Sequence, residues 1–410
     1  MQYTRDGSQF GNQKKISIQH YLVNMLHRIL TSLDENNANK SIAVLLKMVD
    51  WSQAFDRLSH KIGIESFIKN GVRPSLIPIL ISFFKNRKMI VKWNGKKSSL
   101  RPLPGGGPQG GTLGIEEYLS QSNDNADHIE ADDKFKFIDD LSVLEIINLL
   151  SIGLASYNCH SHVPSDMGID NLFLDPQNIK SQEHLDKIQE WTESKLMKLN
   201  TQKSNYMIFN FASKFKFNTR LKLDNIKLDQ ISETKLLGVR IRDDLSWKSN
   251  TSELTKKAYS RMIIIKKLIQ FNVPLAELIQ IYILYIRSVV EQSAVVWHTS
   301  ITIGEQKDLE RIQKVALRLI LGEKYITYIQ ALKVTGLETL KSRRTRLSLK
   351  FALKCVKNKK TAHMFPVNSN PVNTRHYENF HVTKARTSRL AKSAISYMHR
   401  LFNEHYRRRI

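Results

Sequence analysis

Two adjacent carboxylates, Asp139 and Asp140, are the residues of this chain whose type and setting best suit them to chemistry. They stand between Lys134–Phe137, in which lysine alternates with phenylalanine, and the mainly apolar run Leu141–Leu144. The alternation is typical of a half-buried strand, so the two runs predict a hairpin with the acidic pair at its tip. Adjacent carboxylates raise each other's pKa unless a cation neutralises them, and their oxygens suit Mg²⁺. An exposed turn that merely contains Asp-Asp is the alternative, because aspartate favours turns.

A third carboxylate, Asp50, follows the run Ile42–Val49, which is apolar apart from Lys47. Such a run predicts a central strand that is buried on both faces, with Asp50 at its end. If this strand lies beside the hairpin, three carboxylates meet at one end of the sheet. They would form a site for two Mg²⁺ ions about 3.5–4 Å apart, suited to phosphoryl transfer, and Mn²⁺ could substitute.

A glycine-rich segment, Pro104–Gly114, lies between Asp50 and the acidic pair in the sequence. Glycines allow a ligand or a nucleic acid to approach the backbone closely. No Gly-Lys-Ser/Thr follows, so the segment is not a Walker-type phosphate loop. An ordinary flexible loop is the alternative.

The net charge of +25 is unevenly placed along the 410 residues. Residues 1–200 carry 23 Lys+Arg and 23 Asp+Glu, whereas residues 201–410 carry 40 and 15, so the whole excess lies in the second half. A neutral front half and a basic back half predict a nucleic-acid partner that is gripped mainly by the back half. A solvated basic surface without a partner is the alternative.

Cysteine usage and hydropathy exclude several classes of protein. The two cysteines, Cys159 and Cys355, are too few for a cysteine-rich zinc site or a disulfide scaffold, and they fit a reducing, intracellular location. The polar start of the chain shows no secretory signal. The most apolar stretch, 275–297, contains charged residues, which favours a buried helix over a membrane span.

Periodicity and turn residues predict the elements that must position these groups. We expect helices over 16–34, 59–70, 75–84, from the acidic hairpin to about 157, 181–199, 253–271, 274–297, 305–321, 340–357 and 387–409, strands over 42–49, 206–211 and 236–241, and a second hairpin around Asn94-Gly95.

Several motifs, taken in order, resemble the reverse transcriptases of non-LTR (LINE-like) retrotransposons. The segments that carry the resemblance are Gln9-Phe10-Gly11, Val49–Asp56, Gly106-Gly107-Pro108-Gln109-Gly110, Phe137-Ile138-Asp139-Asp140, Leu199-Asn200 with Lys203-Ser204, Leu236–Val239 with Leu245-Ser246-Trp247, 282–297 and Arg343-Arg344. The resemblance covers about residues 9–355. The Asp-Asp box is a weak signal by itself, but several motifs in the same order are highly specific.

The resemblance implies an α+β fold, the palm of a right-hand polymerase, with an antiparallel sheet and packed helices. It implies partial fingers in 1–35, the palm in 36–245, a helical thumb or connector in 246–356, and a linker with a basic amphipathic tail helix in 357–410. It also implies a truncated copy, because the chain starts near the end of the fingers. The chain departs from the family pattern at Gly107, where a β-branched residue is usual, at Gly111 and Glu116-Glu117, which break the usual apolar stretch, and at Ile138, where a small residue is commoner.

The resemblance also implies a role for each matching residue. Asp50, Asp139 and Asp140 would be the catalytic carboxylates and the metal ligands. Phe55 would be the steric gate that rejects a ribose 2′-hydroxyl, or only a core residue. The nucleotide-binding residues besides Phe55 would be Gln109, Gly110 and Lys203, of which Lys203 would lie near the leaving pyrophosphate or be only a surface lysine.

The expected function is therefore RNA-directed DNA synthesis on a primer 3′-hydroxyl with two Mg²⁺ ions. The partners implied are an RNA template, a DNA primer and dNTPs, with no membrane, and a retroelement enzyme would act at nuclear DNA. A non-catalytic nucleic-acid binder that keeps the fold is the first alternative. A protein-interaction scaffold built on the helical half is the second.

Overall fold

The computed structural model describes residues 6–36, 41–108, 111–149, 172–173, 180–212, 217–368, 380–382 and 384–407. Backbone contacts divide the chain into two compact units. The first consists of Met1–Ser17 with Asn36–Ile231, and the second of Ile18–Glu35 with Ser232–Ile410. Neither unit coincides with one of the four segments expected from the sequence, and the naming of those segments stays a prediction.

The first unit is built on a five-stranded sheet in the order β13-β9-β1-β7-β6. Its neighbours pair antiparallel, except for the parallel pair of β13 with β9. The central strand β1 is buried along its whole length, as a continuous apolar run predicts. The strands are β1 (Ile42–Val49), β6 (Lys134–Phe137), β7 (Asp140–Asn148), β9 (Asn205–Asn210) and β13 (Asp229–Gln230).

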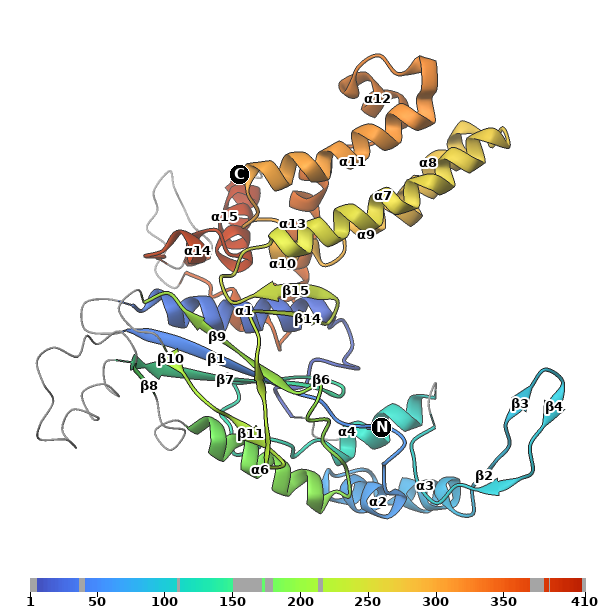
Figure 1. Ribbon diagram of the computed structural model, residues 1–410, viewed down its shortest axis with the longest axis vertical. Coiled ribbons are helices and arrows are strands. Elements are labelled where there is room, and N and C mark those ends of the chain that lie inside the picture. The colour runs from blue at the N-terminus through green and yellow to red at the C-terminus, as the bar shows by residue number, and fades with distance from the viewer. Residues whose placement is uncertain are drawn as a thin grey trace, which may run out of the picture. The chain divides into compact units, whose positions relative to one another are not determined.

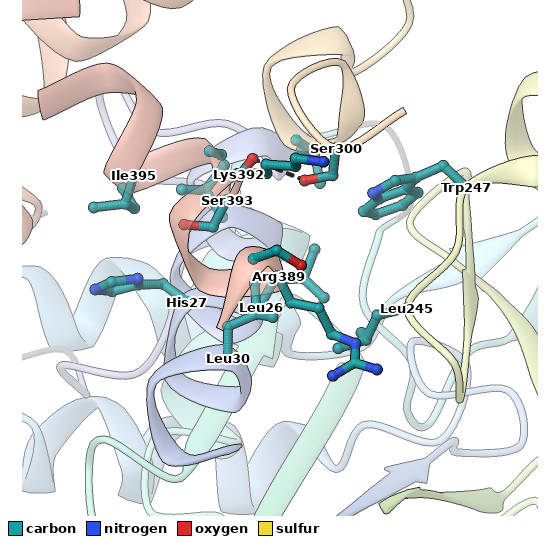
Figure 2. A pocket seen from close by; sticks show the side chains of 14 residues that line it. Leu26, His27, Leu30, Leu245, Trp247, Ser300, Arg389, Lys392, Ser393 and Ile395 are labelled. Carbon is teal, nitrogen blue, oxygen red and sulfur yellow. Dashed lines mark hydrogen bonds between the residues drawn. The ribbon is translucent and has the colours of Figure 1, made fainter. Parts of the chain in front are cut away.

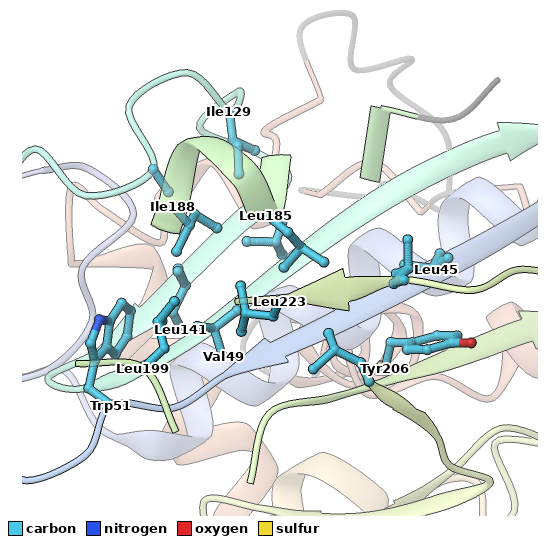
Figure 3. Close-up of a cluster of buried hydrophobic side chains, with 14 of the residues drawn as sticks. Leu45, Val49, Trp51, Ile129, Leu141, Leu185, Ile188, Leu199, Tyr206 and Leu223 are labelled. Atoms are coloured by element: carbon cyan, nitrogen blue, oxygen red, sulfur yellow. The ribbon is translucent and has the colours of Figure 1, made fainter. Parts of the chain in front are cut away.

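In the described part of the unit, this sheet is accompanied by the helices α2 (His60–Lys69), α3 (Ile77–Phe84), α4 (Thr112–Gln121) and α6 (Lys180–Ser194). The side chains of Leu45 and Val49 from β1 belong to one buried cluster with Leu185 and Ile188 of α6 (Figure 3). Because successive side chains of a strand alternate between faces, every second residue of β1 packs toward α6. Ser59 starts α2 as expected, since its hydroxyl accepts a hydrogen bond from the N–H of Ile62.

Lys47 is the one charged side chain on that face of β1, and it is fully buried. Its Nζ donates to Ser181 Oγ at 2.9 Å and lies 3.6 Å from a carboxylate oxygen of Glu145. Burial lowers the pKa of Lys47 to about 8, although Glu145 acts in the opposite direction. The lysine is therefore a satisfied interior group, which explains how it interrupts an apolar strand.

Short strand pairs complete the first unit. The hairpin expected at Asn94-Gly95 is present. The pairs are β2 (Lys88–Met89) with β5 (Arg101–Pro102), β3 (Lys92–Trp93) with β4 (Lys96–Lys97), β8 (Leu172–Phe173) with β10 (Phe217–Asn218), and β11 (Lys222–Leu223) with β12 (Ile226–Lys227).

The second unit is mainly helical and contains one two-stranded hairpin. Its helix α1 packs against α10, α14 and α15, which come from the C-terminal third of the chain (Figure 1). Trp297 is the largest of its fully buried side chains. The elements are α1 (Ile18–Asp34), β14 (Glu233–Leu236), β15 (Val239–Arg242), α7 (Lys248–Gln270), α8 (Leu275–Ile281), a π-helical turn (Tyr282–Arg287), α9 (Ser288–Val290), α10 (Ala294–Trp297), α11 (Ile303–Leu321), α12 (Tyr328–Thr335), α13 (Leu340–Val356), α14 (Ser388–Ala391) and α15 (Ala394–Arg407).

The tail of the chain packs against the rest of the second unit. The apolar side chains of α14 and α15 are buried in the second unit; they include Leu390, Ile395, Met398 and Phe402. The carboxylate of Asp34, at the end of α1, accepts hydrogen bonds from the N–H groups of Arg386 and Thr387 at 2.8 and 2.7 Å. The tail is thus docked onto its unit.

A pocket of about 190 Å³ lies within the second unit, beside α1 and the start of the tail (Figure 2). His27 and Leu30 of α1 line it together with Arg389 and Lys392. Burial, followed by the charges of two other histidines, lowers the pKa of His27 to about 4, so this ring is neutral near pH 7.

Several expected elements were wrong in extent. Strand β7 runs to Asn148 where a helix was expected to begin after Leu144, and residues 150–157 of that expected helix lie outside the described residues. The expected strand 236–241 is two strands, because Leu237 and Gly238 have positive φ and reverse the chain. The expected helix 274–297 is broken at Ser293, whose φ is also positive. No helix among the described residues is long and apolar enough to cross a membrane.

Candidate active site

The register of the sheet brings Asp50 and Asp140 to the same place. The last pair between β1 and β7 joins Val49 to Leu141. Asp50 directly follows Val49, and Asp140 directly precedes Leu141. Figure 3 shows Val49, Leu141 and Trp51, which follows Asp50, close together at this end of the sheet. Two carboxylates that are 90 residues apart in sequence therefore lie at the neighbouring ends of adjacent strands, Asp50 just after β1 and Asp140 at the start of β7.

The third carboxylate, Asp139, lies in the tight turn between β6 and β7. Phe137 pairs with Asp140, so only Ile138 and Asp139 form the loop. Ile138 has a φ of +58°, a left-handed conformation that is a genuine outlier for a β-branched residue. Such strain costs on the order of 1–3 kcal/mol and persists only where the surroundings hold it.

The N-terminal segment holds this strained turn in place. Gln9 accepts a hydrogen bond from the N–H of Ile138 at 3.0 Å, and its amide lies 3.5 Å from the Ile138 carbonyl. The N–H of Phe10 donates to the Lys136 carbonyl at 2.8 Å. A Cβ on Gly11 would lie 2.6 Å from the backbone nitrogen of Ile138, so only glycine fits there.

Two lysines of β6 bind the same N-terminal segment. Lys136 Nζ lies 2.6 Å from the carboxylate of Asp6, and Lys134 Nζ lies 3.6 Å from it. Burial opposes ionisation of Asp6, but the charge and hydrogen bond of Lys136 prevail and hold its pKa at about 2. The alternation that predicts this strand is thus explained by a buried ion pair on one face and by Phe135 in the core on the other.

The pKa values of Asp139 and Asp140 are both raised by burial, and a neighbouring carboxylate contributes to each shift. Burial raises the pKa of Asp140 to about 6, and the charges of Asp139 and Asp50 add to this effect. Burial also raises the pKa of Asp139, with a further contribution from Asp50. The phenol of Tyr118 is fully buried in the field of all three, and burial raises its pKa well above the ordinary value, which keeps it neutral. The site is a concentration of negative charge that is poorly solvated.

These carboxylates are the hard oxygen donors that divalent cations prefer. Their mutual repulsion is the property that a bound cation would relieve, so the donor set fits such an ion. Among the described residues, however, no three His, Cys, Asp or Glu side chains converge closely enough to hold a metal ion. The expected three-ligand arrangement is therefore not preformed in these side-chain positions.

The segment that follows Asp50 holds the glycine-rich loop. Backbone N–H groups of Gly106 and Gly107 donate to the carbonyls of Leu58 and Phe55, each at 2.8 Å. Gly107 is buried, and a Cβ there would approach a methyl carbon of Leu58 to 2.9 Å. A β-branched residue, which the family pattern has at this position, would therefore require the Leu58 side chain to shift.

The nucleotide-binding residues expected from the sequence have different outcomes. Phe55 is half-buried, and its ring stacks on Tyr118 with centroids 5.0 Å apart. Lys203 is exposed in a turn whose neighbour Ser204 accepts a hydrogen bond from the N–H of Asp50 at 3.1 Å. Gln109 and Gly110 lie outside the described residues. The catalytic and binding roles of all these residues stay predictions.

Sequence reasoning missed two features of this region. The Gln9 contact was missed, although Gln9-Phe10-Gly11 was recognised as a motif, because the motif does not show what its side chains touch. Helix α4 was also missed. It carries Tyr118 and the fully buried Glu117, whose two carboxylate oxygens have no hydrogen-bond partner among the described residues. Burial raises the pKa of Glu117 to about 7.

Comparison with known proteins gives partial matches. No family model matches the chain. It is 25% identical over 254 residues to the probable RNA-directed DNA polymerase from transposon BS of Drosophila melanogaster, covering 59% of this chain and 25% of that protein. It is 30% identical over 193 residues to the RNA-directed DNA polymerase from mobile element jockey of the same species, covering 45% and 18%. The chain thus spans about a quarter or less of these relatives.

Solved structures give weaker matches. Apo telomerase from Candida tropicalis aligns with a TM-score of 0.39 and 12% identity over 87% of this chain and 52% of that one. Telomerase from Candida albicans with a fragment of telomeric RNA aligns with a TM-score of 0.36 and 11% identity over 87% and 54%. The sequence matches to BS and jockey confirm the resemblance seen in the motifs: this chain is similar, over part of their length, to RNA-directed DNA polymerases of mobile elements.

Proposed function

We propose that this chain is the polymerase part of a retrotransposon reverse transcriptase, which extends a DNA primer on an RNA template. The observation that supports this most directly is the register that sets Asp50 beside Asp140, next to Asp139. The polymerases of BS and jockey are the relatives that motivate the activity. The β13-β9-β1-β7-β6 sheet would be the palm, and the helices from α7 to α13 would form the thumb and connector.

Asp50, Asp139 and Asp140 would hold the divalent cations. When bound, a pair of Mg²⁺ or Mn²⁺ ions would promote ionisation of the primer 3′-hydroxyl and offset charge on the departing pyrophosphate. Burial of the carboxylates serves this purpose, because poorly solvated charges attract a cation more strongly than exposed ones. The side chains would have to turn toward one another on binding, since no three acidic, histidine or cysteine side chains of the described residues converge closely enough to hold a metal ion.

The remaining residues would shape the nucleotide site. Phe55 would contact the sugar. Because its ring stacks on the buried ring of Tyr118, it could not move aside to make room for a ribose 2′-hydroxyl. Gln109 and Gly110 would contact the incoming nucleotide from the glycine-rich loop. Lys203, held near the end of β1 by its turn, would meet the pyrophosphate.

Primer extension tests the proposal. A DNA primer annealed to an RNA template is incubated with the chain, dNTPs and Mg²⁺ or Mn²⁺, and extended products are resolved by length. Asp139→Asn keeps the shape of the side chain and removes its charge, so we expect a loss of rate of about 100-fold or more. Asp132→Asn is the matched control, because Asp132 is an exposed acid two residues before the hairpin strand.

Two outcomes would contradict the proposal. If Asp139→Asn extended the primer as fast as the unaltered chain, the turn at Asp139 would not be the catalytic site. Salt-sensitive binding of nucleic acid without any incorporation by the unaltered chain would reduce it to a binding protein.

A further inference from the structure

A separate feature of the first unit is the arm Lys88–Pro102, which consists of β2, β3, β4 and β5. Figure 1 shows it reaching away from α2, α3 and α4 of the same unit. Every residue of the arm is exposed, so it contributes nothing to a core. A segment that is ordered but unburied needs another explanation for its composition.

That composition is unusual for a solvent-exposed hairpin. Trp93 is 82% exposed, and Leu100, Val91 and Met89 are 61%, 57% and 45% exposed. A tryptophan buries more apolar area than most side chains when it finds a partner, and soluble proteins rarely leave such surface open without a use for it. The arm is therefore a candidate contact surface.

Charge identifies the kind of partner. The arm carries Lys88, Lys92, Lys96, Lys97 and Arg101, and its sequence contains no aspartate or glutamate. An apolar protein partner would not require this excess of cations. A polyanion with flat apolar groups matches both properties, and nucleic acid has phosphates and base faces together.

The turn geometry fixes the arrangement of ring and charge. Asn94 and Gly95 both have positive φ, the conformation of the tight hairpin turn that Asn-Gly favours. Trp93 pairs with Lys96 across this turn, so the two side chains project from the same face. The hydrogen bonds that join Val91 to Ser98, both 2.9 Å long, extend the pairing beyond β3 and β4.

We propose that the arm is a contact site for single-stranded nucleic acid, in which an unpaired base stacks on Trp93 and the flanking phosphates bind Lys96 and the neighbouring cations. This inference rests on the proposed function in naming its nucleic-acid partner, but the arm lies outside the residues assigned to catalysis. Stacking requires a base that is free of its own neighbours, which favours single strands over duplexes. Phosphate charge and base faces are common to RNA and DNA, so both should bind.

Equilibrium binding tests this without turnover. The probes are fluorescein-labelled U20 RNA, dT20 DNA and a 20-base-pair RNA duplex, measured by anisotropy over a range of salt concentrations. For both single strands we expect Trp93→Ala to weaken binding about tenfold or more and Trp93→Phe to restore most of it. Phe271→Ala is the control, because Phe271 is 78% exposed in the second unit and lies far from the arm in sequence.

The salt dependence separates stacking on Trp93 from phosphate binding by the lysines. Trp93→Ala should leave the slope of log K against log salt unchanged, because it removes no charge. Lys96→Gln with Lys97→Gln should make the slope shallower by about 0.7 for each phosphate that the variant no longer neutralises. Duplex binding should be insensitive to Trp93→Ala.

Unchanged single-strand affinity in Trp93→Ala would overturn the proposal, as would an equal loss for the duplex. A chain that binds as expected but extends no primer would contradict the polymerase assignment and leave the arm's assignment standing. Conversely, a chain that extends primers but whose affinity for single strands does not depend on Trp93 would contradict the proposal for the arm and leave the polymerase assignment standing.

Discussion

Gln9 binds the peptide groups on both sides of Ile138, the residue immediately before Asp139 in the turn. The side chain of Gln9 is 4% exposed and also accepts a hydrogen bond from the N–H of Gly11 at 2.7 Å. A left-handed isoleucine does not hold its conformation unaided. The direction in which Asp139 points thus depends on a residue 130 positions earlier in the chain.

Replacing Gln9 by alanine should affect catalysis more than folding. The change leaves the N–H of Ile138 without its acceptor, which costs about 1–3 kcal/mol of unfolding free energy. Relaxation of the turn should also lower kcat for primer extension while the KM for dNTP changes little. Urea denaturation and steady-state kinetics measure the two effects. A stability loss with undiminished kcat would make Gln9 a structural residue only.

Two glycines of the same segment give a matched pair. A Cβ at Gly11 would lie 2.6 Å from Ile138, whereas one at Gly7 meets nothing within 4 Å. Gly11→Ala should therefore displace the turn and lower both stability, by about 1–3 kcal/mol, and primer extension. Gly7→Ala should leave both as they are. Equal behaviour of the two variants in thermal unfolding and extension assays would contradict the close packing of Gly11 against the turn.

Glu117 predicts a dependence of stability on pH. Its folded pKa, raised to about 7 by burial, lies above the ordinary value of 4.5, so folding favours the protonated acid. The unfolding free energy should fall as pH rises from about 4.5 to 7, by on the order of 3 kcal/mol from this group. Glu117→Gln should remove this group's share of the slope in denaturation curves taken at several pH values, whereas the share of Asp140, whose pKa is raised to about 6, should stay.

The neighbouring acid is the control for that slope. Glu116 is half-buried and accepts a hydrogen bond from Asn12 at 3.0 Å, so Glu116→Gln should keep the fall in stability between pH 4.5 and 7. A Glu117→Gln chain with the original slope would show that another group is responsible.

Asp34 predicts how firmly the tail is attached within the second unit. Burial opposes its ionisation, but hydrogen bonds from Thr387 and Arg386 lower its pKa below the ordinary value. Its stabilising effect is thus present above the unfolded pKa and is lost as pH falls through the lower folded pKa. Asp34→Ala should speed tryptic cleavage after Arg386 and Arg389. Asp308→Ala is the control, because Asp308 is exposed, and it should leave the cleavage rate unchanged. Equal cleavage rates for the two variants would contradict the role of Asp34.

The sequence predicts well those elements whose signals are local. The apolar run of β1, the serine cap of α2 and the Asn-Gly turn each specify their structure within about ten residues. Strand β7 was cut short because its apolar run has no clear period, and such a run fits a strand or a buried helix equally well. Only its pairing with β1 decides the matter, and that pairing involves residues about 100 positions away.

The site was predictable to a similar extent. The three carboxylates can be picked out in the sequence because they stand in motifs that occur in the same order as in the family, although the Asp-Asp pair alone is a weak signal. Their surroundings depend on segments distant in sequence: Gln9 binds Ile138, Tyr118 is buried in the field of the carboxylates, and Ser204 accepts from the N–H of Asp50. The left-handed Ile138 could not be foreseen, since nothing in the residue type favours that conformation.

The chain passes from one compact unit to the other after Ser17, after Glu35 and again after Ile231. A gene cut at codon 231 would therefore yield two poor fragments. The N-terminal piece would carry α1 without α10, α14 and α15, against which it packs. The C-terminal piece would expose the apolar side chains that α1 covers. Recombinant halves of this protein will need to be produced together, or rebuilt with the 18–35 segment grafted onto the second.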